Sequence, residues 1–117
     1  MTNCLFCNII KKEIPAKVQY EDDLVLAFDD INPLAPIHIL IIPKIHVQSI
    51  NDLENKDAEL IGKMILAAKA IAEEKGIAKD GYKLLFRTGR HGQQEVEHIH
   101  LHLIGGAQLK EGIGPVR

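Results

Sequence analysis

A run of alternating histidines near the carboxyl end of the chain has the residue types that phosphorus chemistry needs. Residues 98–103 read His-Ile-His-Leu-His-Leu. Successive side chains of a β-strand point to opposite faces, so we expect His98, His100 and His102 to line one face of a strand over Glu97–Ile104 while the aliphatic residues enter the core. Imidazole has an unperturbed pKa of about 6.5 and can act near pH 7 as nucleophile, acid or hydrogen-bond donor. One ring could therefore attack phosphorus while its neighbour donates to the phosphate oxygens.

Two plainer interpretations of the same face stay open. Polar side chains at alternate positions of a strand can simply face solvent, which is the usual explanation for a single histidine. Alternating histidines on a strand can also supply two imidazole ligands to a zinc ion. Three imidazoles in strict alternation favour a chemical role over the solvent-facing one.

The two cysteines raise a separate question of metal binding. Cys4 and Cys7 are separated by two residues, a spacing that suits two ligands of a tetrahedral metal site. They are too few and too close to indicate a disulfide framework. The alternative is that both remain reduced and pack as small apolar side chains.

Composition limits the class of protein. The 117 residues are 46% hydrophobic and 26% charged, the balance of an ordinary globular protein, and we expect one domain over residues 1–117. A net charge of −2 provides no general attraction to nucleic acid or anionic membranes, so we expect neither as a partner. We find no secretory leader and no apolar run long enough to span a membrane, and we therefore expect a cytoplasmic protein.

Hydrophobic periodicity predicts an α+β fold with an antiparallel sheet. One long amphipathic helix is expected over Asp57–Lys75, with Gly76 as its stop, and no regular strand-helix-strand alternation is present to build a parallel sheet. A short helix and five strands complete the prediction, namely the helix Leu5–Lys12 and the strands Val18–Tyr20, Leu24–Phe28, His38–Ile42, Lys83–Arg87 and Glu97–Ile104.

The loop before the histidine run is a second candidate for phosphate binding. Residues 89–95 read Gly-Arg-His-Gly-Gln-Gln-Glu. Backbone amides exposed by glycine can cradle phosphate oxygens. A solvated hairpin turn explains the same residues equally well.

The chain resembles the histidine triad (HIT) superfamily, and in particular its Hint branch of bacterial type. The resemblance rests on the His-x-His-x-His run with its apolar continuation through Gly106, and it extends over almost the whole chain. The other matching segments are residues 12–16, 21–23, 28–33, 35–38 and 41–44. It implies a HIT-like fold in which a five-stranded antiparallel sheet carries one long helix and a short N-terminal helix. It also implies a homodimer whose two sheets join into one of ten strands.

The resemblance implies an enzyme that hydrolyses purine nucleoside 5′-phosphoramidates or acyl-nucleotidylates and releases a nucleoside monophosphate of the AMP or GMP type. By position, His100 matches the nucleophile that forms a nucleotidyl-histidine intermediate, and His102 matches the donor to the α-phosphate. His98 and His38 match the residues that support them. No cofactor is implied for catalysis.

The nucleotide-binding positions follow from the same resemblance. Asp30 matches the carboxylate that accepts hydrogen bonds from the ribose hydroxyls. The remaining positions line the purine pocket or the phosphate side, namely Leu5, Phe6, Phe28, Asp29, Ile31, Arg87, Gln93, Gln94 and Glu95. Three residues depart from the family pattern: Arg87 replaces an asparagine, Gln93 a glycine and Glu97 a tyrosine. A side chain at residue 93 adds a Cβ where the backbone is expected to need unusual dihedral angles.

The resemblance also suggests a structural zinc site formed by Cys4, Cys7, His46 and His98. Two other functions stay open. One is hydrolysis of dinucleoside polyphosphates or nucleotidyl transfer, as in other branches of the superfamily. The other is a nucleotide-binding regulatory module with vestigial activity, which the departures at Arg87 and Gln93 allow.

Overall fold

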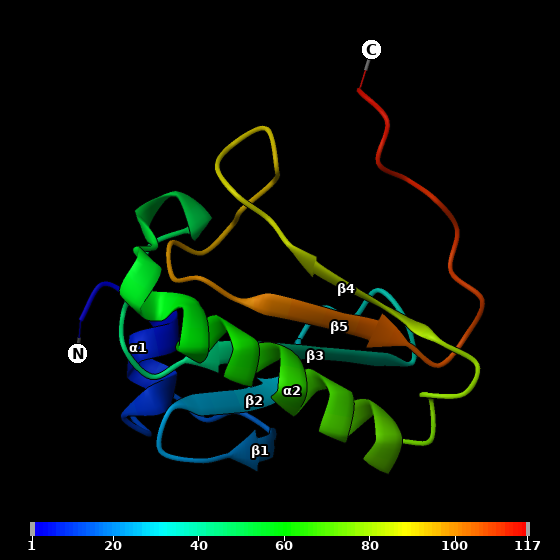
Figure 1. Ribbon diagram of the computed structural model, residues 1–117, viewed down its shortest axis with the longest axis horizontal. Coiled ribbons are helices and arrows are strands. Elements are labelled where there is room, and N and C mark those ends of the chain that lie inside the picture. Colours follow the sequence, from blue (N-terminus) through cyan, green and yellow to red (C-terminus); the bar gives the residue numbers. More distant parts are fainter. Residues whose placement is uncertain (1, 117) are drawn as a thin grey trace.

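The computed structural model describes residues 2–116, which form one five-stranded antiparallel sheet with a long helix packed against it (Figure 1). The strand order is β1-β2-β3-β5-β4. The elements in chain order are α1 (Leu5–Ile10), β1 (Val18–Glu21), β2 (Val25–Asp29), β3 (Ile37–Pro43), 3-10 turns at Ile50–Asp52 and Asn55–Asp57, α2 (Ala58–Glu74), β4 (Tyr82–Phe86) and β5 (Leu101–Gly105). The predicted α+β class and antiparallel sheet are confirmed.

Helix α2 covers one face of the sheet with the apolar stripe that its periodicity predicts. Met64, Ala68 and Ile71 are buried against alternate residues of the central strands, such as Ile39 and Ile41. The helix ends where Gly76 adopts a φ of 75°, and the amides of residues 76 and 77 donate to the carbonyls of residues 73 and 72. This pair of bonds is a Schellman motif, which satisfies the last carbonyls of the helix and confirms the predicted stop.

The opposite face of the sheet carries the short helix α1. Phe6 and Ile9 from α1 pack against the other set of alternate strand residues, which includes Phe28, Leu40 and Ile42. The central strands are therefore buried on both faces, which explains their continuous apolar sequence. Because Leu40 pairs with His102 across the β3–β5 ladder, the histidine of β5 projects to the α1 face.

The prediction that one strand carries all three histidines was wrong. Strand β5 begins at Leu101, and residues 97–100 lie outside the ladder, with a bend at residues 97 and 98. The amide of Ile99 donates to the carbonyl of Val47 at 2.7 Å, so the backbone here bonds to the connection after β3 and not to a neighbouring strand. Of the three histidines in the run, His102 alone lies in a strand.

Two smaller expectations also need correction. Helix α1 ends at Ile10, two residues before the predicted end, because Lys12 turns into the left-handed region with a φ of 65°. On α2, Ile65 follows the apolar periodicity of the helix, yet it is 43% exposed and lies outside the buried stripe. Within residues 2–116 the structure has no helix that is long and apolar enough to cross a bilayer.

Candidate active site

His38 and His102 form a hydrogen-bonded pair whose tautomers the backbone determines. The amide of Leu34 donates to Nδ1 of His38 at 3.1 Å, so this nitrogen carries no proton and Nε2 of the neutral ring must carry one. Nε2 of His38 therefore donates to Nδ1 of His102, 2.9 Å away. The remaining proton of His102 lies on Nε2, which is buried without a hydrogen-bond partner in the described part of the chain. This unpartnered donor is available for an anion.

His100 has the opposite tautomer. Its Nδ1 lies 2.8 Å from the backbone carbonyl oxygen of His98, and because a carbonyl can only accept, Nδ1 donates. Nε2 of the neutral ring then carries a lone pair. The rings of His100 and His102 are 4.9 Å apart between centroids, so the ring with the free lone pair and the ring with the unpartnered N–H are neighbours. This arrangement can attack a phosphorus atom and bind its oxygens in the same step.

Burial keeps these rings neutral. His38, His100 and His102 are 5%, 6% and 7% exposed. Desolvation lowers the pKa of His38 and of His100, and it lowers the pKa of His102 to about 3, with a further contribution from the repulsion that His102 would meet if His100 or His38 were protonated as well. The nucleophile therefore needs no separate base to free its lone pair at neutral pH.

Aromatic side chains from α1 and β2 form an apolar wall beside the histidines. The ring of Phe6 contacts His100 edge to face at a centroid distance of 5.0 Å and Phe28 at 5.5 Å. Both phenylalanines are buried. The structure does not bring the other two apolar residues predicted for the purine pocket into this cluster, since Leu5 is 42% and Ile31 89% exposed.

The two adjacent aspartates have different surroundings. Oδ2 of Asp30 lies 3.4 Å from Nε2 of His38, so this carboxylate belongs to the histidine cluster. Its Oδ1 accepts from the amide of Asn32 at 2.8 Å, which fixes the carboxylate at the start of the loop after β2. Asp29 instead accepts a hydrogen bond from Gln19 on β1 at 2.9 Å. Of the two predicted aspartates, Asp30 is the one beside the histidines.

The loop between β4 and β5 is held by Gln94. Its side-chain amide donates to the carbonyls of Gln48 and Val96 at 2.7 and 3.0 Å, and its oxygen accepts from the amide of Gly89 at 3.0 Å. Gln94 thus braces the loop, while Glu95 is exposed. The expected unusual backbone at Gln93 is confirmed, since its φ is 62°.

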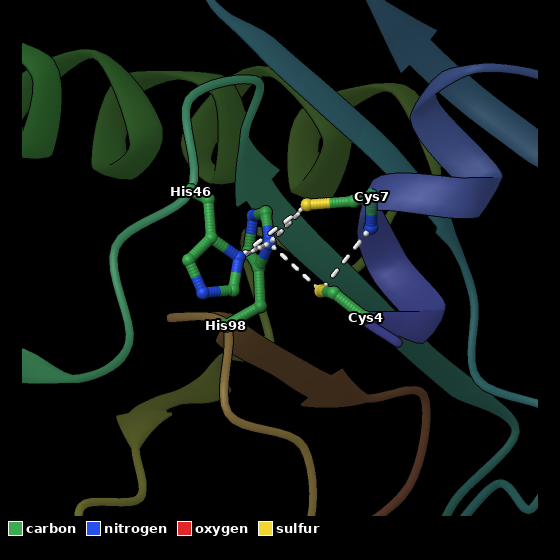
Figure 2. Close-up of side chains that lie close together, drawn as sticks. All are labelled: Cys4, Cys7, His46 and His98. Carbon is green, nitrogen blue, oxygen red and sulfur yellow. Dashed lines mark hydrogen bonds between the residues drawn. The ribbon is translucent and has the colours of Figure 1, made fainter. Parts of the chain in front are cut away.

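The two cysteines meet two histidines from distant parts of the sequence (Figure 2). Cys4 Sγ lies 3.4 Å from His98 Nδ1, Cys7 Sγ lies 3.3 Å from His46 Nδ1, and the two Nδ1 atoms are 3.2 Å apart. All four ligand atoms lie within 4.8 Å of one another. A tetrahedral zinc ion with bonds of about 2.0 to 2.3 Å places its ligands about 3.3 to 3.8 Å apart, so this set fits zinc.

The tautomer of His98 also fits metal binding. Its Nε2 lies 2.9 Å from the carbonyl oxygen of Pro43 and therefore donates, which leaves a lone pair on Nδ1 directed at the cysteines. Desolvation and the neighbouring Cys4 raise the pKa of the Cys7 thiol, and a bound cation would favour its thiolate form. The ring of His98 is thereby committed to this cluster, and only its backbone carbonyl supports His100.

The backbone partners of the histidines were not found from the sequence. The amide of Leu34 and the carbonyls of Pro43 and His98 determine three tautomers, yet they belong to residues whose side chains carry no chemical signal. A backbone group is present at every residue, so only the folded chain shows which ones face a ring.

Known proteins match this chain over nearly its whole length. Residues 3–114 match the family described as scavenger mRNA decapping enzyme C-term binding. The purine nucleoside phosphoramidase of Escherichia coli K12 is 53% identical over 105 residues, which cover 90% of this chain and 88% of that protein. Protein HitA of Neisseria gonorrhoeae is 48% identical and covers 90% and 97%. The crystal structure of a HIT family hydrolase from Legionella pneumophila superposes with a TM-score of 0.93 at 50% identity, covering 96% of this chain and all of that one.

Proposed function

The chain belongs to the histidine triad family, and from this premise we propose that it hydrolyses purine nucleoside 5′-phosphoramidates or related acyl-nucleotidylates. The similarity to the E. coli purine nucleoside phosphoramidase supports the hydrolase class and the P–N bond as its target. The single observation that carries the mechanism is the pairing of a lone pair on Nε2 of His100 with the unpartnered N–H of His102.

In the first step, Nε2 of His100 attacks the α-phosphorus and the bond from phosphorus to the leaving nitrogen breaks. The amine departs with the bonding electrons and takes up one proton from solvent. Nδ1 of His100 keeps its proton and its hydrogen bond to the carbonyl of His98. This hydrogen bond stabilises the positive charge that develops on the ring. The N–H of His102 donates to an oxygen of the phosphoryl group, where negative charge accumulates.

In the second step, a water molecule attacks phosphorus and the bond to His100 breaks. The nucleoside 5′-monophosphate leaves with the water oxygen, and the proton that water releases balances the one taken up by the amine. His38 holds His102 in the donating tautomer through both steps, because its own Nδ1 is occupied by the amide of Leu34. Positioning and charge stabilisation then supply most of the rate, as in other phosphoryl transfers.

The nucleoside would bind beside the phosphate on the α1 face. The aromatic wall of Phe6 and Phe28 makes this side of the site apolar, which suits a purine base. The carboxylate of Asp30 is suited to accept hydrogen bonds from both ribose hydroxyls. These assignments predict a preference for purine ribonucleotides.

The cluster of Cys4, Cys7, His46 and His98 would hold a structural zinc ion. When bound, the metal supplies a cross-link between α1, the connection after β3 and the segment before β5. The ion would lie behind the nucleophile. The ring of His98 faces the ion, and the backbone carbonyl of His98 faces His100. No step of the reaction needs it.

We also propose that two copies of the chain pair through β4. In the described residues this strand is one edge of the sheet, and all five of its residues are half-buried. Pairing with a symmetry-related β4 would satisfy its free backbone groups and join the two sheets. Ile65 and Leu66 on α2 are 43% and 64% exposed, and the same partner would bury them. Light scattering at micromolar concentration should give twice the monomer mass.

The test is release of a fluorescent amine from an adenosine 5′-phosphoramidate. Replacing His100 with alanine or glycine should lower turnover by about three orders of magnitude or more while AMP still binds. The exposed His91 provides a matched control, and His91→Ala should retain wild-type turnover. Unchanged turnover in both His100 variants would refute the mechanism. A folded wild-type protein that binds AMP without turnover would favour the regulatory module.

A further inference from the structure

Arg87 lies on the histidine face of the sheet. In the β4–β5 ladder Leu85 pairs with His102 and Phe86 with Leu101. Directly opposed residues of an antiparallel pair project to the same face, so Leu85 and His102 share one face. Arg87 is the residue directly after the end of β4 and follows Leu85 by two positions, so continuing the alternation of the strand places it on that face as well. The chain thus places a guanidinium group at the end of β4, next to the segment that carries His100.

A second side chain holds this guanidinium. Nη1 of Arg87 donates to Oε1 of Gln93 at 3.3 Å. Gln93 reaches this position from a left-handed backbone with a φ of 62°, which is uncommon for a residue with a Cβ. Two of the three departures from the family pattern therefore contact each other, and a strained conformation accompanies the contact.

Arg87 has no carboxylate partner within ion-pair distance among residues 2–116. Burial is the main cause of the lowered pKa of His38 and of His102, and the positive charge of Arg87 lowers both further. Within residues 2–116, Arg87 therefore brings a guanidinium without a carboxylate partner to the face of the sheet that His102 occupies.

We propose that Arg87 binds the α-phosphate together with His102 and so is a further catalytic residue of this chain. Its guanidinium donates to a phosphoryl oxygen, the unpartnered Nε2–H of His102 donates to another, and Gln93 holds the guanidinium in place. The inference rests on the proposed function only in taking a nucleotide as the substrate.

The first test separates the phosphate from the nucleoside by comparing affinities for AMP and adenosine by calorimetry. Arg87→Gln should weaken AMP binding by at least about tenfold, the amount expected for a charge-assisted hydrogen bond, and leave adenosine binding unchanged. Adenosine affinity also reports that the variant is folded. Arg90→Gln, at an exposed arginine in the same loop, is the matched control and should behave as wild type. An unchanged AMP affinity in Arg87→Gln, or equal losses for both ligands, would overturn the proposal.

The second test asks whether the guanidinium acts on the reaction. Arg87→Ala should lose turnover of the adenosine phosphoramidate, and added guanidinium ion should restore part of it in a saturable manner, whereas a purely structural arginine would not be replaced by a free ion. Absence of rescue would contradict a catalytic role. If wild type turns over no phosphoramidate, the proposed function fails, but the ratio of AMP to adenosine affinities still decides whether Arg87 binds phosphate.

Discussion

The neutral state of His102 makes the stability of the protein depend on pH. Burial lowers the pKa of this ring to about 3 in the folded chain, against about 6.5 when unfolded. Between these values the unfolded state binds more protons than the folded state, so stability is fully present above pH 6.5 and is lost as the pH falls. At pH 5, which is 1.5 units below the unfolded pKa, this one residue lowers the free energy of unfolding by about 2 kcal/mol.

The perturbation that isolates this contribution is His102→Gln, which removes the titrating group. We expect the free energy of unfolding of wild type to fall by at least about 2 kcal/mol between pH 7.5 and pH 5, because His38 and His100 also have a lowered pKa. In His102→Gln the fall should be smaller by about 2 kcal/mol. The variant will be less stable at pH 7.5, and only the change with pH is compared.

The assay is urea unfolding at fixed protein concentration, with chelator present so that metal release does not contribute. His91→Gln makes the same chemical change at an exposed ring and should keep the wild-type dependence. If His102→Gln loses as much stability as wild type between the two pH values, His102 is not a buried neutral ring and the assignment of its proton is wrong.

Two further perturbations test the metal cluster and the strained loop. Chelation should lower the Tm by about 5 °C or more, since the metal links three segments, while turnover of the phosphoramidate persists. Cys7→Ser should make the Tm insensitive to chelator. Loss of turnover on chelation would contradict a purely structural metal. Gln93→Gly should raise the free energy of unfolding by about 0.5 to 1 kcal/mol, because glycine adopts a φ of 62° without strain. A lower unfolding midpoint in urea would mean that the hydrogen bond between Gln93 and Arg87 outweighs that strain.

The elements of the fold were predictable because their signals are local. The apolar stripe of α2 and the glycine after it determine a helix of the observed length, and the continuous apolar sequence of β3 matches a strand buried on both faces. The histidine run identified the residues of the site, since few other patterns place three imidazoles at alternate positions. The geometry of the run differs from the predicted strand, because the chain joins the sheet only at Leu101 and the amide of Ile99 donates to the carbonyl of Val47.

What the sequence by itself determined is the identity of the reacting groups, their order and the family to which they belong. Tertiary structure alone decided which nitrogen of each ring carries a proton, because the partners are backbone groups such as the amide of Leu34 and the carbonyl of His98. It also decided that Arg87 and Gln93 meet across the loop and that Cys4 and His98, 94 positions apart, lie within bonding reach of one ion. Some of these groups are only two to six positions apart and others are 94 apart, yet residue types alone do not pair them, because the dihedral angles of the folded chain decide which groups face each other.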